Sequence, residues 1–367
     1  MNKDNDNKRQ GKENMRLELC LWTVLCVGAM AVMMFFAANK TIVIADVPSD
    51  LTGSSDALEE IGSAQGSELT IQRTSDGGNV FYVPLPKGIK AENVKVENHY
   101  IHSELWLGIR CETPGFFEEK ALTGDTGFIR EGRYEYQEDG VLLKLKMNRV
   151  MEYRSTLKGD VLEVACYEPG ELYDYVVVLD PVADDSDTPA MDGQVKAEDV
   201  ALSVARMVQK NQAFDDVRVY LTRAEGTRLS GEDRLALTEQ VGADLYIGIV
   251  VSRDETDSDR YGILCYYNQD YFIPYFGNVN LADILTREAA MASSNRALGL
   301  EPAGRDSLLG HMKIPAALLS VGYLSNAQER ELLEQEGYQE KLAEGILTAL
   351  SKACRELEYM RAAETAE

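Results

Sequence analysis

The feature that most constrains the fold is the alternation of strand and helix patterns over residues 173–356. Short apolar runs rich in β-branched residues predict buried strands, and longer runs with apolar residues three and four positions apart predict amphipathic helices. The predicted strands cover residues 175–181, 217–223, 243–251, 262–268 and 315–324. The predicted helices cover residues 197–209, 231–242 and 280–298, and two more helices close the chain. This order predicts an α/β domain whose mostly parallel sheet carries helices on both faces.

A second pattern, over residues 68–168, predicts a small all-β domain of the sandwich type. Short runs rich in β-branched and aromatic residues are separated by glycine-containing turns, and several runs alternate apolar and polar residues. The predicted strands cover residues 69–74, 79–85, 94–100, 104–110, 141–147 and 160–167. His99 and His102 lie three residues apart here, a spacing that points strand side chains to opposite faces, so we do not expect a shared metal.

Residues 19–38 carry no charged side chain and predict a transmembrane helix. A helix of this length, at ~1.5 Å per residue, spans roughly the 30 Å hydrocarbon core of a bilayer. Basic residues are frequent before the run, whereas Lys40 is the one basic residue between it and Arg73. This bias predicts a cytoplasmic tail at residues 1–18 and places the C-terminal domains outside the cell, in a single-pass membrane protein. The alternative is a cleaved signal peptide, whose apolar region is usually shorter, at about 7–15 residues.

Residues 39–67 are predicted to link the transmembrane helix to the β domain, and residues 357–367 to form a tail. The stretch from 47 to 67 is rich in Ser, Gly and Asp, which is typical of a flexible stalk.

The formal net charge of −24 excludes nucleic-acid binding that depends on neutralising phosphates. The chain has six cysteines but no C-x-x-C pair, which argues against a zinc ribbon or a thioredoxin-like centre. Disulfides and buried free thiols both remain open for the cysteines that follow residue 38.

Five segments, in order and at plausible spacing, carry a resemblance to a known family. They are VVVLDP, VRVYLTR followed by Arg234, GADLYIGI, IPAALLSVGYLSNAQE and YQEKLAEGI. Together they resemble the zinc-dependent N-acetylmuramoyl-L-alanine amidases, which cut peptidoglycan, over roughly half of the chain. The resemblance implies one Zn²⁺ held by two histidines and a glutamate, with a second glutamate as general base.

All four of those positions differ in this chain. Ala183 and Val250 replace the histidines, Ala197 replaces the liganding glutamate, and Ser320 replaces the base. No histidine lies between His102 and His311, so a shifted alignment does not recover the ligands. The replacements predict that the domain binds no zinc and has no catalytic residue of the family kind.

The ends of the predicted strands still offer polar side chains for a binding groove, because ligands in such folds sit beyond the carboxyl ends of the strands. The groove candidates are Asp180, Asp184, Asp185, Ser252, Ser320 and Asn326. Asp180, Asp184, Asp185 and Asp187 could together bind Ca²⁺, but they are interpreted as a solvated acidic turn, since an EF-hand count from Asp185 meets Ala190 and Lys196 instead of Gly and Glu. A triad of His311, Ser320 and an aspartate lacks the G-x-S-x-G nucleophile elbow.

The resemblance and its missing residues predict a membrane-anchored, wall-facing pseudoenzyme. It would bind peptidoglycan, or a protein partner in the cell wall or membrane. One alternative is an active amidase that uses substitute metal ligands, with Asp180, Asp184 and Glu198 as candidates. Another is a scaffold without a ligand, in which side chains such as Val250 fill the groove.

Overall fold

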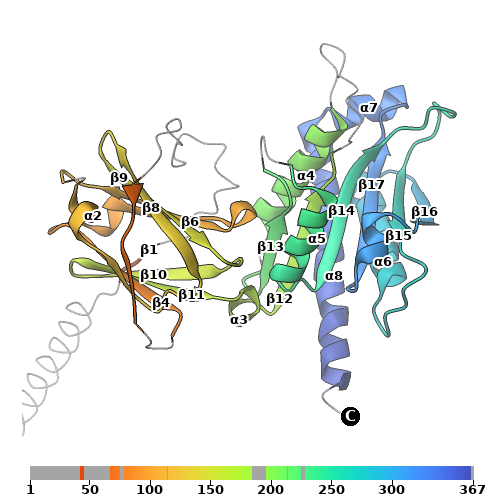
Figure 1. Ribbon diagram of the computed structural model, residues 1–367. Helices are drawn as coiled ribbons and strands as arrows, with labels where there is room; N and C mark the ends of the chain where they lie inside the picture. Colours follow the sequence, from red (N-terminus) through yellow and green to blue (C-terminus); the bar gives the residue numbers. More distant parts are fainter. Residues whose placement is uncertain are drawn as a thin grey trace, which may run out of the picture.

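The computed structural model describes residues 42–44, 67–74, 78–113, 115–183, 196–212, 214–224 and 228–364. These residues form a β domain and an α/β domain that lie side by side (Figure 1). Among the residues described, no helix is both long enough and apolar enough to cross a bilayer. The predicted cytoplasmic tail at residues 1–18 and the predicted transmembrane helix at 19–38 lie outside the described ranges. The prediction of a tail at residues 357–367 is wrong for residues 357–364, which continue the last helix, α8 (Glu336–Glu364), where Leu357 packs into the core; residues 365–367 lie outside the described ranges.

The β domain is a sandwich of two sheets, as the sequence patterns predict. One sheet has the strand order β1-β10-β11-β4-β7-β3 and the other β2-β8-β9-β6-β5. Between them lies a core that includes Phe81, Leu107, Leu143 and Leu162, all fully buried. The strands are β1 (Ile42–Ile44), β2 (Ser67–Glu68), β3 (Ile71–Arg73), β4 (Val80–Pro84), β5 (Val94–His99), β6 (Glu104–Arg110), β7 (Leu122–Gly124), β8 (Ile129–Gln137), β9 (Gly140–Met147), β10 (Glu152–Lys158) and β11 (Val161–Tyr167).

The sequence patterns miss several of these strands, and one of them changes the expected domain boundary. β1 lies inside residues 39–67, which were expected to be a linker, and pairs antiparallel with β10 from Ile42 opposite Leu157 to Ile44 opposite Ser155. The strands β8 and β10 escape detection because charged residues and a glycine interrupt their apolar alternation. The tertiary partner therefore decides whether these segments become strands.

The α/β domain contains one six-stranded sheet with the order β13-β12-β14-β17-β15-β16. All neighbouring pairs are parallel except β15 with β17, which confirms the predicted mostly parallel sheet. The strands are β12 (Tyr175–Pro181), β13 (Val217–Leu221), β14 (Leu245–Ser252), β15 (Ile263–Tyr267), β16 (Ala297–Pro302) and β17 (Ala316–Tyr323). Every residue of β12 is buried, as its continuous apolar run predicts.

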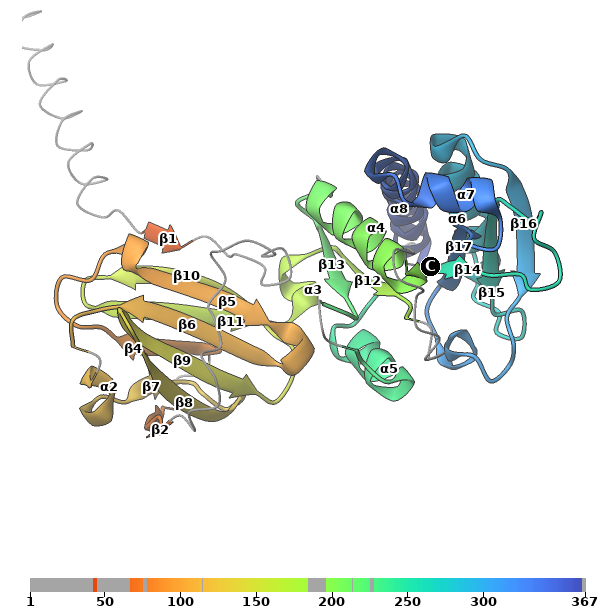
Figure 2. The ribbon, with the colours of Figure 1, turned by 90° about the horizontal axis from the view of Figure 1, so that it is seen from above.

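Helices cover both faces of this sheet, but unequally (Figure 2). One face packs against α4 (Ala197–Asn211), α6 (Asn278–Ser293) and α8 (Glu336–Glu364) through a large apolar core. The other face packs against α5 (Gly231–Gln240) and the short 3-10 helix η4 (Leu308–His311). The short α7 (Ala327–Leu333) follows β17. In α4, the buried residues Val200, Ala201, Val204, Ala205 and Val208 form the apolar face that their spacing predicts.

The prediction of one helix over residues 280–298 is wrong at its C-terminal end. Helix α6 ends at Ser293, and Ser294 adopts a left-handed conformation (φ 54°) as its cap. Residues 297–302 then form the edge strand β16, parallel to β15. The left-handed residue reverses the chain direction, which helical periodicity alone does not reveal.

The two domains meet through specific polar contacts at the edge strand β13. Glu152, at the start of β10, is 1% exposed and accepts hydrogen bonds from Arg218 Nε (2.7 Å) and from the Tyr220 hydroxyl. The rings of Tyr100 and Tyr220 pack edge to face, with centroids 4.9 Å apart. Covering β13 in this way protects the exposed edge of the parallel sheet.

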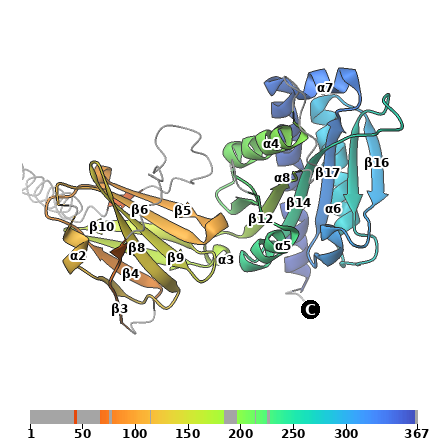
Figure 3. The same cartoon turned by 45° about the horizontal axis from the view of Figure 1, so that its top comes forward.

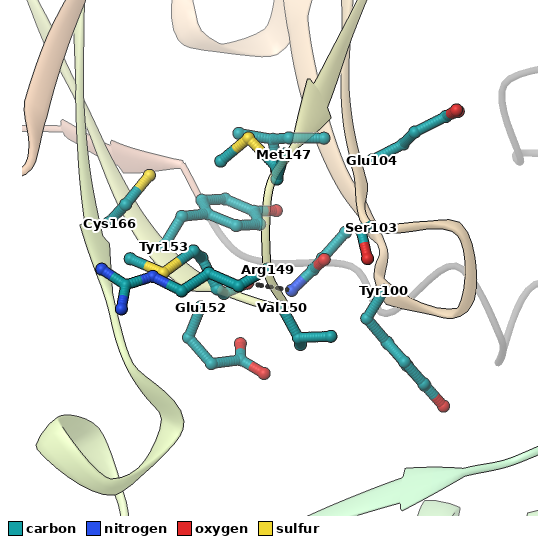
Figure 4. A pocket seen from close by; sticks show the side chains of 12 residues that line it. Tyr100, Ser103, Glu104, Met147, Arg149, Val150, Glu152, Tyr153 and Cys166 are labelled. Atoms are coloured by element: carbon teal, nitrogen blue, oxygen red, sulfur yellow. Dashed lines mark hydrogen bonds between the residues drawn. The ribbon is translucent and has the colours of Figure 1, made fainter. Parts of the chain in front are cut away.

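A small cavity lies on the β-domain side of this junction (Figure 4). Its lining includes Tyr100, Glu152, Tyr153 and Cys166, and the side-chain amide of Asn98 donates to the Met151 carbonyl (2.9 Å) beside it. The volume is about 10 Å³, which is room for one water molecule at most. This cavity is therefore a packing feature and not a substrate site.

Candidate functional site at the ends of the parallel strands

Three of the four family positions meet at one edge of the sheet because β12, β14 and β17 are adjacent and parallel (Figures 1 and 3). The Val182 amide donates to the Ile249 carbonyl (2.9 Å), which ties the segment after β12 to β14. Val250 lies opposite Ser320 in the sheet register. Ala183 therefore follows the end of β12 beside the pair Val250 and Ser320, and Ala197 is the first residue of α4.

The residue types at this edge do not fit a zinc ion. Ala183, Ala197 and Val250 have no side-chain donor atoms, and Zn²⁺ in proteins is held by Cys, His, Asp or Glu. In the part of the chain that the structure describes, no group of three or more such residues is placed to hold a metal ion. Ala183, Ala197 and Val250 therefore cannot hold a zinc ion that would activate a water molecule.

Ser320 is buried in a contact that offers no general base. Its hydroxyl lies 2.7 Å from the hydroxyl of Ser252 and 3.5 Å from the Gly322 carbonyl, and the residue is fully buried. A serine hydroxyl becomes a nucleophile only when a base lies beside it. A serine hydroxyl also cannot replace a glutamate as general base, because it takes up no proton at neutral pH. The Ser252–Ser320 contact joins β14 to β17.

Asp180 is buried inside the domain, and it does not line an open groove. Its carboxylate accepts hydrogen bonds from Arg234 Nη1 (2.8 Å), the Thr222 hydroxyl and the Tyr246 hydroxyl. Burial, and then the Asp180 charge, raise the pKa of Tyr246 well above its usual value, so Tyr246 keeps its proton to donate. The network links β12, β13, β14 and α5 at the edge where the strands end.

The carboxylate of Glu198 is also paired with arginines. It forms ion pairs with Arg228 and with Arg223 Nη1 (3.6 Å), and Arg223 Nη2 donates to the Glu198 carbonyl. Burial lowers the pKa of Arg223, an effect that the Glu198 charge opposes. Asp180 and Glu198, two of the three substitute ligands considered, are thus each neutralised by a guanidinium, which disfavours a metal between them. Asp184 and Asp185 lie outside the described residues.

Asn326 serves to hold the segment after β17. Its side-chain oxygen accepts from the Glu329 amide (3.0 Å) at the start of α7, and its amide group donates to the Asp259 carbonyl (3.3 Å). The Asp254 amide in turn donates to the Ser325 hydroxyl (3.1 Å). These contacts fasten the acidic loop at residues 253–261 beside the strand ends.

Glu329 is a buried residue of this edge that is not among the groove candidates predicted from the sequence. Its carboxylate accepts hydrogen bonds from the amides of Tyr323 (2.7 Å) and Gly262 (3.0 Å) and from Asn295 Nδ2 (2.7 Å). Burial raises its pKa, and the three hydrogen bonds oppose that shift. Gly322, at φ 145°, permits the close approach, since a β-carbon there would lie 2.9 Å from the Glu329 carboxyl carbon.

The histidines outside this edge make no catalytic arrangement. His311 is exposed in η4, before the start of β17, while Ser320 is buried toward the other end of that strand. His99 stacks on Trp106 with ring centroids 3.9 Å apart, and its Nε2 lies 3.2 Å from Glu97. His102 lies in a 3-10 turn, so neither the triad nor the metal pair has the geometry it would need.

Comparison with known proteins gives a match for the α/β domain. Residues 177–352 match the family model of N-acetylmuramoyl-L-alanine amidase. The match covers the sheet from β12 to β17 and most of α8.

Individual relatives are distant. The N-acetylmuramoyl-L-alanine amidase LytC of Bacillus subtilis is 24% identical over 170 residues, which are 46% of this chain and 34% of the relative. The germination-specific amidase of the same organism is 26% identical over 185 residues, 47% of this chain and 76% of the relative. A solved amidase from Clostridium difficile 630 is 23% identical, with a TM-score of 0.45, and covers 49% of this chain and 97% of that one. The match spans only about a third of LytC and 39% of a second relative, the amidase CwlM of Mycobacterium tuberculosis.

Proposed function

We propose that this protein is a membrane-anchored, wall-facing pseudoenzyme whose amidase-family domain binds peptidoglycan without hydrolysing it. The single observation that carries the proposal is the edge formed by Ala183, Val250 and Ser320, in which no zinc ligand and no general base is present. Ala197 removes the remaining ligand position at the start of α4.

The retained scaffold supports binding as the remaining function. The strand ends are still organised by Asp180, Glu198, Asn326 and Glu329, each of which is held by several hydrogen bonds or ion pairs. Half-buried Val182, Ala183, Val250 and Ser252 are accessible at the edge. The family match supports a peptidoglycan strand as the occupant.

A working hydrolase with substitute ligands is the less favoured function. It requires Asp180 and Glu198 to face a common metal, whereas their carboxylates are bound to Arg234 on one side and to Arg223 and Arg228 on the other. If a metal ion took over the two carboxylates, Arg234, Arg223 and Arg228 would lose these ion pairs, which is costly in a partly buried site.

Membrane anchoring by residues 19–38 is part of the same proposal and rests on their uncharged sequence and on the basic residues before them. Resistance of the full chain to alkaline extraction from membranes tests this part alone.

The binding proposal is tested by co-sedimentation of the full chain, in mild detergent, with purified peptidoglycan sacculi. We expect the chain to pellet with sacculi and Val250→Arg, which places a bulky charge at the edge, to reduce the bound fraction. Arg287→Glu, on the exposed surface of α6, is the matched control and should bind normally. A chain that stays in the supernatant together with both variants contradicts peptidoglycan binding and favours a protein partner or a ligand-free scaffold.

A further inference from the structure

The position of β1 shortens the expected connection between the membrane and the folded domains. Residues 39–67 are predicted to form a linker, with a flexible stalk at 47–67, yet Ile42–Ile44 already belong to the β domain. Residues 45–66 join β1 of one sheet to β2 of the other, so they connect two strands of one domain. Only residues 39–41 then separate β1 from the predicted transmembrane helix.

This short connection limits how far the β domain can stand from the bilayer. The four Cα–Cα steps from residue 38 to Ile42 span at most about 14 Å when fully extended. Since Ile42 pairs with Leu157, the β10–β11 turn at Lys158–Asp160 lies beside the start of β1. The distance from the turn to the hydrocarbon core is therefore at most about the thickness of the headgroup layer plus one layer of water.

The surface at this end of the sandwich is suited to lipid headgroups. The Leu85 amide donates to the Asp160 carbonyl (2.8 Å), which brings the segment from Pro86 to Asn93 to the same end. Lys87, Lys90 and Lys158 are all exposed there. Glu92, Asp160 and Glu163 lie nearby, and the last pairs with Lys158 (2.8 Å), so residues 86–93 and 158–163 together carry no net charge in a chain of net charge −24. The β8–β9 turn of the other sheet adds Glu138 and Asp139 at this end, and Asp139 pairs with Arg110 (3.6 Å). A near-neutral surface avoids the repulsion that anionic lipids exert on the rest of the molecule.

The opposite end of the same strands carries the α/β domain. Strand β10 runs from Glu152, which binds Arg218 of β13, to Lys158 at the turn. Seven residues at about 3.4 Å each give a strand length of roughly 24 Å. The β domain is thus a spacer with the α/β domain fixed at one end and the membrane connection at the other.

We propose that the end of the β domain formed by the β10–β11 turn and residues 86–90 rests on the phospholipid headgroups of the membrane that holds residues 19–38. This inference depends on the anchoring part of the proposed function and is independent of what the α/β domain binds. It deepens that function because it places the β domain between the bilayer and the α/β domain, on the side that faces the wall.

The test is energy transfer from single dyes on the full chain to acceptor-labelled headgroups in nanodiscs of phosphatidylcholine and phosphatidylglycerol. The dyes are attached to Lys158→Cys or, as the distant control, to Ala297→Cys on the far edge strand β16. In both, Cys20, Cys26 and Cys111 are replaced by alanine, and the buried Cys166, Cys265 and Cys354 remain. A third chain carries the position 158 dye and a Gly/Ser insertion of about 30 residues after Lys40, with a root-mean-square reach of roughly 30 Å.

We expect transfer at position 158 to be at least about twofold that at position 297, given the strand length of about 24 Å and the width of the sheet between them. The insertion should remove most of that difference. Equal transfer at the two positions in nanodisc-bound chains overturns the apposition but leaves anchoring intact. Undiminished transfer at position 158 in the insertion chain supports the apposition and assigns it to the headgroup-facing surface instead of the short connection. Failure of the chain to enter nanodiscs overturns anchoring and the apposition together.

Discussion

The hydroxyl of Tyr100 in the β domain accepts a hydrogen bond from the Leu221 amide (2.8 Å) and donates one to the Leu221 carbonyl (3.1 Å). Leu221 is the last residue of the edge strand β13. The two residues that follow it, Thr222 and Arg223, donate to Asp180 and to the Glu198 carbonyl at the candidate site. One side chain of the β domain thus holds the strand end that organises this edge.

Replacing Tyr100 by phenylalanine should destabilise the protein by about 2–3 kcal/mol, because two buried backbone groups of Leu221 lose their partner. The measurement is urea unfolding of the full chain in detergent. Tyr136→Phe is the matched control, since its hydroxyl binds Glu118 on the exposed surface and its loss should cost within about 0.5 kcal/mol. Equal stabilities of the two variants would show that the Tyr100–Leu221 contact does not join the domains.

Asp180→Ala should cost about 3–5 kcal/mol, because Arg234 and the hydroxyls of Thr222 and Tyr246 lose a buried anionic partner. Glu198→Ala should cost about 1 kcal/mol, since Arg228 is half exposed. Unfolding midpoints of the two variants check this order. If both carboxylates held a catalytic metal instead, both variants would lose bound metal and a hydrolytic activity of the parent chain, whatever their stability.

Acid should remove a contribution that Asp254 makes to stability. Its side chain accepts from Thr256 Oγ1 (2.7 Å) and from the amides of Thr256 and Asp257 (3.0 Å each), and these bonds lower its pKa from 3.8 to about 2. A carboxyl with a lowered folded-state pKa stabilises the fold above its unfolded pKa, and this contribution is lost as the pH falls from about 4 toward 2. The difference in urea midpoint between the parent chain and Asp254→Asn should be present at pH 7 and shrink toward pH 2. A difference that is constant over this range would contradict the assignment.

Restoring the four family residues tests whether the scaffold of the site has been kept. Because β12, β14 and β17 end side by side, the combined variant Ala183→His, Ala197→Glu, Val250→His and Ser320→Glu should bind about one zinc ion per chain. The parent chain should bind none above background in the same metal analysis. The variant that restores only Ser320→Glu supplies no ligand set and is the control. A quadruple variant that folds but binds no zinc would show that the edge has also lost the family's geometry.

Sequence patterns predicted the α/β domain well because its strands are buried on both faces and its helices are strongly amphipathic. The predicted bounds of β12 match residue for residue, and α4 begins at Ala197 as expected. The end of α6 was missed because Ser294 takes a left-handed conformation and Asn295 is bound to Glu329 and Tyr338, partners far along the chain. β1 was missed for the same kind of reason, since a three-residue strand is defined by its partner β10.

The candidate site was predicted only in part. The absence of imidazole and carboxylate at four positions is a property of the sequence and needs no structure. That Asp180 points into a buried network, and that Ser320 pairs with Ser252, depends on which residues of β13, α5 and β14 lie beside them. Spacing along one chain does not contain this information, because the partners lie 42 to 68 residues away.

The proposed function is that residues 177–352, which match the amidase family model, bind peptidoglycan without amidase chemistry. The most direct measurement is the release of stem peptides that begin with L-alanine from purified peptidoglycan, by the full chain supplied with an equimolar amount of Zn²⁺. We expect no release above that of the heat-denatured chain, although the native chain should sediment with the peptidoglycan. Release of stem peptides that a chelator abolishes and added Zn²⁺ restores would contradict it.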